Sequence, residues 1–126
     1  MAYQIHIEVK EQYLLAVFAG TFDKVGYKEN LSDILLQSIK NERLKLLLDV
    51  RNMSGNLTTI QRHEVATYFT NLCREHPYTR KIQVAVVGDP PLIDPNRFGE
   101  TVAINLGLNI SVTNDMDEAL KWLGVE

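Results

Sequence analysis

The stretch Leu44–Val50 constrains the fold of this 126-residue chain more than any other part of the sequence. It reads LKLLLDV, a nearly continuous apolar run with the length of one β-strand. A strand with one face in water alternates apolar and polar residues, whereas a strand covered on both faces is apolar throughout. The stretch therefore predicts an inner strand of a sheet, with other elements packed on both of its faces.

Two strand-like segments precede this inner strand. Tyr3–Val9 alternates apolar and polar residues, which is typical of a half-buried strand, and Tyr13–Ala19 has strand composition and ends at Gly20. Only the polar turn 10–12 separates the two segments. We therefore expect an antiparallel hairpin at the start of the chain.

Amphipathic helices are expected on both sides of the inner strand. The first covers about Lys24–Asn41, with Thr21 or Asp23 as its N-cap. Arg51–Leu57 is expected to be a polar loop, because polar residues and a glycine replace the apolar run there. The next helix starts at a capping box formed by Thr58 and Gln61, and it runs to His76.

After this helix, strands and helices continue to alternate, and each helix is bounded by residue types that are typical of helix ends. The expected elements are a strand at Ile82–Val87, a helix that starts at Asp94-Pro95 and ends near Gly107, a strand at Leu108–Thr113, and a helix capped by Asn114 or Asp115 and ended by Gly124. Strands joined by helices of this length pair in parallel. The sequence thus predicts one α/β domain over residues 1–126, with a mixed sheet of about five strands and about four helices.

Composition and charge exclude several classes of protein. Hydrophobic residues make up 45% and charged residues 23% of the chain, as in ordinary globular domains. The net charge is −3, and the sequence contains no sign of the basic face that a nucleic-acid binder needs. We therefore expect no nucleic-acid partner. No apolar stretch is long enough to span a membrane, and the single cysteine, Cys73, cannot form an internal disulfide. We therefore expect a cytoplasmic protein.

The sequence carries no recognisable catalytic, metal or cofactor motif. No two glycines have the spacing of a Gly-x-Gly-x-x-Gly or Walker loop, and no Gly-x-Ser-x-Gly elbow is present. His6, His63 and His76 are spread over a strand and the two ends of one helix, so no metal site is expected. Cys73 and His76 lie near a helix C-terminus, where the dipole disfavours a thiolate. We predict no catalytic residue and no cofactor, and an enzyme that uses Arg51 with Asp49 or Asp89 is the alternative hypothesis.

One group of polar residues is the candidate binding or regulatory edge. In open parallel sheets, ligands and partners meet the edge at the carboxyl ends of the strands. Arg51 can pair with an anion there, and Ser54 or Thr58 can be phosphorylated beside a helix N-terminus. A solvated loop without a function is the alternative interpretation. The candidate residues are Asp49, Arg51, Asn52, Ser54, Thr58 and Asp89.

Several short motifs, in order along nearly the whole chain, resemble the SpoIIAA-like branch of the STAS superfamily (sulfate transporter and anti-sigma-factor antagonist domains). The pattern that most suggests it is an acidic pair followed by Ala-Leu-x-Trp-Leu near the C-terminus. The residues that carry the resemblance are the N-terminal hairpin with Gly20-Thr21, Leu46–Arg51, Val84–Gly88, Arg97–Glu100 and Asp117–Leu123.

The resemblance implies a bacterial cytoplasmic domain that acts as a non-catalytic protein-interaction or regulatory module, with a protein partner or a second copy of itself. Some STAS relatives are switched by phosphorylation where the helix after the central strand begins, which corresponds here to Asn52–Thr59. The relatives' Asp-Ser-Ser-Gly-like run is absent, and only Ser54-Gly55 is kept. The comparison of this branch with CRAL-TRIO lipid carriers implies an alternative function, a small carrier of a lipid or other apolar ligand.

Overall fold

Strands and helices alternate along residues 4–125, the part of the chain that the computed structural model describes. Asp23 is the N-cap of the first α-helix and Thr58 is the N-cap of the second, and both were predicted as caps. The elements in chain order are β1 (Gln4–Val9), β2 (Leu14–Thr21), α1 (Lys24–Asn41), β3 (Lys45–Ser54), α2 (Thr59–Glu75), a 3-10 helix η1 (Tyr78–Lys81), β4 (Gln83–Val87), α3 (Phe98–Asn105), β5 (Asn109–Thr113) and α4 (Met116–Leu123).

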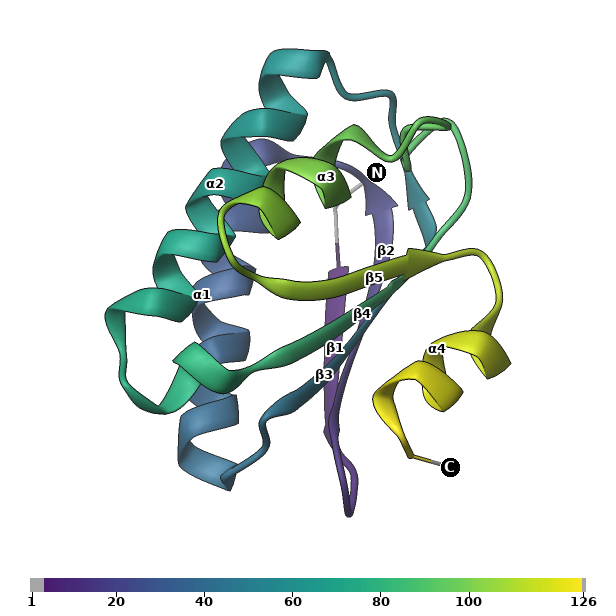
Figure 1. The fold of residues 1–126 in the computed structure, drawn as a ribbon. Helices are drawn as coiled ribbons and strands as arrows, with labels where there is room; N and C mark the ends of the chain where they lie inside the picture. The colour runs from purple at the N-terminus through teal and green to yellow at the C-terminus, as the bar shows by residue number, and fades with distance from the viewer. Residues whose placement is uncertain (1–3, 126) are drawn as a thin grey trace.

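The five strands form one mixed sheet in the order β1-β2-β3-β4-β5 (Figure 1). β1 and β2 are an antiparallel hairpin, and the pairs β2·β3, β3·β4 and β4·β5 are parallel. Each parallel pair is joined by a helical connection, which is what parallel pairing requires. The predicted fold class, a mixed five-stranded sheet with four α-helices, is confirmed.

The sheet carries helices on both faces, so its middle strands are buried on both sides. α1, α2 and α3 cover one face, and α4 lies against the other (Figure 1). Along β3, Leu46 and Leu48 belong to the larger core with α1, α2 and α3, whereas Leu47 packs in a second cluster with Leu123 of α4. This alternation explains the nearly continuous apolar run of β3.

The predicted loop Arg51–Leu57 is wrong for its first four residues, because β3 continues to Ser54. Its pairing with β2 resumes after an irregularity between Val17 and Ala19, and Thr21 faces Ser54 at the end of the ladder. Met53 is buried in this extension. Pairing with a neighbouring strand therefore overrides the polar, loop-like composition of the segment.

The start of the third helix also differs from the prediction. α3 begins at Phe98 with Arg97 as its N-cap, in a left-handed backbone conformation at φ 54°, and not at Asp94-Pro95. The Asp94 carboxylate still accepts the Phe98 backbone N–H at 2.9 Å. The Asp94 side chain thus accepts one of the free N–H groups in the first turn of α3, which is the role that an N-cap side chain usually has.

Candidate functional site

Asp49 and Arg51 form a bidentate ion pair on β3. Arg51 Nε donates to Asp49 Oδ1 at 2.9 Å, Arg51 Nη2 donates to Oδ2 at 2.8 Å, and the Arg51 backbone N–H adds a third bond at 3.1 Å. The Asp49 side chain is 7% exposed and that of Arg51 is 43% exposed. Burial by itself raises the pKa of Asp49, but the hydrogen bonds from Arg51 outweigh it and hold this pKa below its ordinary value.

Arg51 is therefore already paired, and it does not present a free cation to an external anion as the sequence had led us to expect. The hydrogen bond to Asp49 comes first among the causes that raise the pKa of Arg51, and the charge of Asp89 acts in the same direction. Asp89 is exposed and follows β4, the strand next to β3. The structure thus brings together Asp49, Arg51 and Asp89.

The other predicted residues have separate local roles. Asn52 and Ser54 are exposed at the end of β3, where the Ser54 carbonyl accepts the Phe22 N–H at 2.8 Å. Thr58 completes a reciprocal capping box: its Oγ1 accepts the Gln61 N–H at 3.1 Å, and its own N–H donates to Gln61 Oε1 at 2.9 Å. The Thr58 hydroxyl is thus engaged in starting α2.

Two exposed apolar side chains near this edge were missed by the sequence reasoning. Val25, in the first turn of α1, is 62% exposed, and Ile60, in the first turn of α2, is 72% exposed. The same ends of the two helices are joined by Lys24 Nζ and Glu64 Oε2 at 3.1 Å. An isoleucine placed off the buried stripe, two residues after the capping Thr58, is the sequence signal that points to such an exposed side chain.

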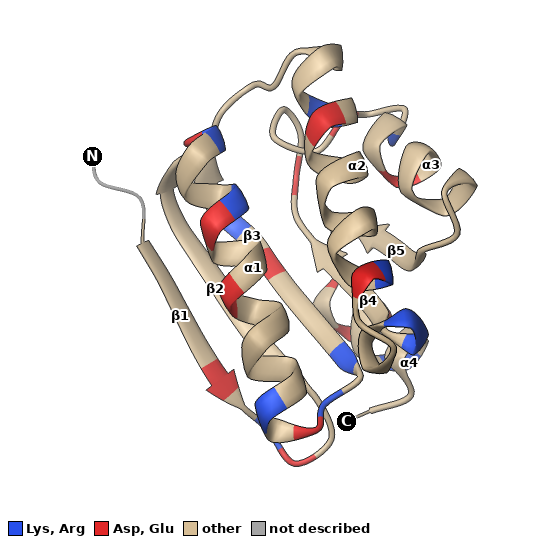
Figure 2. Ribbon diagram, turned by 90° about the vertical axis from the view of Figure 1, so that its left-hand side faces the viewer, with Lys and Arg blue, Asp and Glu red and all other residues tan. Residues whose placement is uncertain are grey.

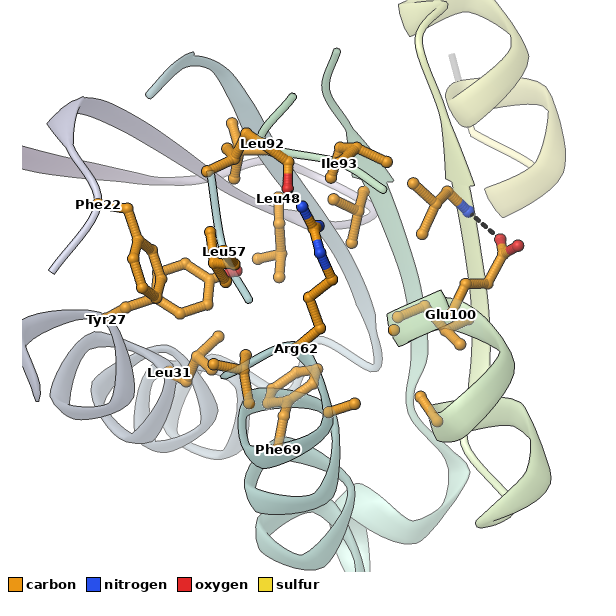
Figure 3. A pocket seen from close by; sticks show the side chains of 18 of the residues that line it. Phe22, Tyr27, Leu31, Leu48, Leu57, Arg62, Phe69, Leu92, Ile93 and Glu100 are labelled. Atoms are coloured by element: carbon orange, nitrogen blue, oxygen red, sulfur yellow. Dashed lines mark hydrogen bonds between the residues drawn. The ribbon is translucent and has the colours of Figure 1, made fainter. Parts of the chain in front are cut away.

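A second feature is an apolar cavity of about 140 Å³ between the sheet and the three helices of its larger core (Figure 3). Its walls are the side chains of the same core pattern that predicted the fold, so nothing in the sequence separates this hollow from a filled core. The lining residues are Phe22, Tyr27, Leu31, Leu48, Val50, Met53, Leu57, Arg62, Val65, Ala66, Phe69, Val86, Leu92, Ile93, Gly99, Glu100, Ala103, Ile110 and Val112.

Both charged residues of this lining are bonded to backbone groups. Arg62 on α2 donates through Nη1 to the Leu92 carbonyl at 2.6 Å and through Nη2 to the Pro91 carbonyl at 2.9 Å. Glu100 on α3 accepts the N–H of Val112 on the edge strand β5. Figure 3 shows the guanidinium of Arg62 directed at Leu92, and Glu100 turned toward the strand. Apart from the hydroxyl of Tyr27, the remaining side chains of the wall are apolar.

Two solved structures resemble this chain over nearly its whole length. An anti-sigma factor antagonist from Mycobacterium paratuberculosis is 14% identical, with a TM-score of 0.63 over 98% of this chain and 95% of its own. An uncharacterised DUF3478 family protein with a SpoIIAA-like fold, from Shewanella loihica PV-4, is 20% identical, with a TM-score of 0.56 over 96% of this chain and 93% of its own. The chain has a SpoIIAA-like fold. No family model matches the sequence, and neither does any curated protein.

In this SpoIIAA-like fold, the thiol of Cys73 is inaccessible, and the described residues contain no cluster of metal-ligating side chains. Cys73 is buried on α2, and burial raises the pKa of its thiol to about 12. Among residues 4–125, no three side chains of His, Cys, Asp or Glu gather as metal ligands would. Over the same residues, no helix combines the length and the apolar composition needed to cross a membrane. The exposed side chains of Val25 and Ile60 and the apolar cavity are the features that a partner or a ligand could contact.

Proposed function

We propose that this chain is a non-catalytic regulatory domain that binds a protein partner through the first turns of α1 and α2. The observation that carries the proposal is the exposure of Val25 and Ile60 at these helix ends, where the carboxyl ends of β2 and β3 also lie. Partners of open parallel sheets meet this edge. A similar fold occurs in a protein described as an anti-sigma factor antagonist, which is a description of a regulator.

The surroundings of the two side chains support a protein interface. Specific interfaces combine an apolar centre with a polar rim, and exposed apolar side chains gain about 25 cal/mol for each Å² that a partner covers. Here the polar neighbours are the Lys24–Glu64 ion pair and the capping box of Thr58. Charges of both signs occur along α1 (Figure 2), so this helix offers no single sign that would select a polyanion.

A non-catalytic role is supported by the state of the two most reactive polar groups. The guanidinium of Arg51 is held by Asp49, which takes up its bidentate face. The thiol of Cys73 is buried and stays protonated at neutral pH, since its pKa is about 12. We place the protein in the cytoplasm, because a buried cysteine without a disulfide suits a reducing compartment.

The test compares what the parent chain and two double variants retain from the cytosol of the native host. Val25→Asp with Ile60→Asp removes the proposed contact, and Leu36→Asp with Ile104→Asp is the matched control, because these exposed apolar residues lie elsewhere on α1 and α3. We expect a specific protein to be lost with the first variant and kept with the control. Retention of every bound protein by the first variant would contradict the proposal. Sedimentation of the purified chain shows whether the retained protein is a second copy.

The cavity favours a second candidate function, carriage of a small apolar ligand. The hollow of about 140 Å³ is apolar and partly open to solvent, as a binding site for a small apolar molecule would be. Native mass spectrometry of the purified protein tests this function. A discrete added mass that is released on unfolding supports a carrier, and a spectrum of the bare chain, after purification under mild conditions, contradicts it.

A further inference from the structure

We infer that residues 88–97 form a lid over part of the apolar cavity, that Arg62 holds this lid in place, and that the space beneath takes a compact, uncharged apolar ligand. The inference rests on the second candidate function, and it narrows the ligand class and names the opening element. The lid connects β4 to α3 and contains Leu92 and Ile93, which both line the cavity.

The lid is anchored at its two ends and at its middle. At the β4 end, Gly88 donates its N–H to the Thr113 carbonyl at 3.0 Å, and a side-chain carbon at Gly88 would lie only 2.9 Å from Ile93 Cγ1. At the α3 end, Asp94 accepts the Phe98 N–H. Between these ends, Leu92 is buried although the segment has no strand or helix of its own.

Arg62 is the link between α2 and the middle of the lid. Its two bonds, to the carbonyls of Pro91 and Leu92, come from one charged group, and such charge-assisted bonds are stronger than neutral ones. Arg62 is itself half-buried and lines the cavity together with Leu92 and Ile93 of the lid. Loss of the link would therefore release the middle of the lid from α2.

The size and chemistry of the cavity select the ligand. Its volume of about 140 Å³ is close to that of an engineered apolar cavity of about 150 Å³ that binds benzene. Arg62 and Glu100 are the charged residues of the described lining, and each is hydrogen-bonded to backbone groups, so a charged headgroup would have to compete with these bonds. A molecule of the size of a single aromatic ring fits these limits better than a long acyl chain.

Toluene is the probe for the ligand class. We expect it to shift the amide NMR signals of Leu92, Ala103 and their neighbours in the ¹⁵N-labelled chain, and to raise its melting temperature. Ala103→Leu and Ala66→Leu each place a larger side chain on a helix that lines the cavity, and we expect either variant to lose these shifts. A melting curve of each variant shows that it folds.

The lid is tested by the exchange rate of toluene in Arg62→Gln. Arg74→Gln is the matched control, because Arg74 lies on the same helix and donates to the Leu106 carbonyl at 2.9 Å, away from the cavity. We expect toluene to leave Arg62→Gln at least about tenfold faster than the parent, as loss of a charge-assisted hydrogen bond implies. The Arg74→Gln variant should keep the parent rate.

The outcomes distinguish the lid from the ligand class and both of these from the carrier function. Equal release rates from Arg62→Gln and Arg74→Gln, with the shifts intact in the parent, overturn the lid and leave the carrier function standing. Absence of shifts in both the parent and Arg62→Gln overturns the compact ligand class. The carrier function itself is decided separately by the mass of any co-purified ligand.

Discussion

Arg51 lies two residues after Asp49 on the same strand, and its guanidinium holds the Asp49 carboxylate through bonds of 2.9 and 2.8 Å. Residues two apart on a strand share a face, so this pairing needs only local backbone geometry. The carboxylate is buried and the guanidinium is partly exposed, which makes Arg51 the group that compensates the burial of Asp49.

Arg51→Ala is expected to destabilise the fold by about 1 kcal/mol, because it leaves a buried carboxylate without its main partner. We expect the lower end of the range for such losses, since Arg51 is 43% exposed and water can replace part of its bonding. Urea unfolding measures the change. Asn52→Ala, at an exposed neighbouring position, should stay within about 0.5 kcal/mol of the parent. An Arg51→Ala variant as stable as Asn52→Ala would show that Asp49 does not depend on the pair.

The same pair predicts a dependence of stability on pH. The pKa of Asp49 lies below its ordinary value of 3.8 in the native state, so the native state binds the proton more weakly than the unfolded chain. The resulting stabilisation is fully present above the unfolded pKa and is lost as the pH falls through the native pKa. Unfolding free energies measured from pH 5 downward should therefore fall less steeply in Asp49→Asn than in the parent. Identical slopes would contradict the lowered pKa.

The sequence predicted those features of the fold that depend on neighbouring residues, and it missed those that depend on contacts between distant residues. The capping box of Thr58 and Gln61 and the apolar run of β3 involve only neighbouring residues, and both predictions are confirmed. The extension of β3 to Ser54 depends on its pairing with β2, which polar composition concealed. The start of α3 depends on a left-handed Arg97, a conformation that no residue type in the segment announces.

The candidate site shows the same division. Asp49, Arg51 and Asp89 were predicted because they lie at the carboxyl ends of strands in the sequence. In the structure, Asp49 and Arg51 are paired on β3, and Asp89 follows the neighbouring β4. That Arg51 is occupied by Asp49 is a matter of side-chain geometry, which the sequence does not contain. The apolar cavity is equally hidden, because its lining and a filled core share one hydrophobic pattern.

Thr58→Ala should cost about 1 kcal/mol of stability, because α2 loses the hydroxyl that accepts the Gln61 N–H. Thr59→Ala is the control, since Thr59 is also exposed and is the first residue of α2, after the cap. Thermal unfolding of both variants measures the difference. If the two substitutions have the same effect, Thr58 is not the residue that starts the helix.

Cys73 should resist thiol reagents in the native protein. Its thiol is 1% exposed, and its pKa of about 12 leaves it protonated at pH 8. A disulfide reagent at pH 8 should modify the cysteine only after urea has unfolded the chain, with an unfolded sample as the reference rate. Modification of the folded protein at that reference rate would contradict the buried position of Cys73 on α2.

The most direct measurement of the central claim is the affinity of the purified partner protein for the parent chain and for Val25→Asp with Ile60→Asp. Val25→Asp and Ile60→Asp each place a carboxylate without a partner in the proposed interface, and burial of an unpaired charge is unfavourable. We therefore predict that the double variant binds at least about tenfold more weakly, while Leu36→Asp with Ile104→Asp binds as the parent does. Equal affinities of the parent and the Val25 and Ile60 variant would contradict the assignment of the partner site to the first turns of α1 and α2.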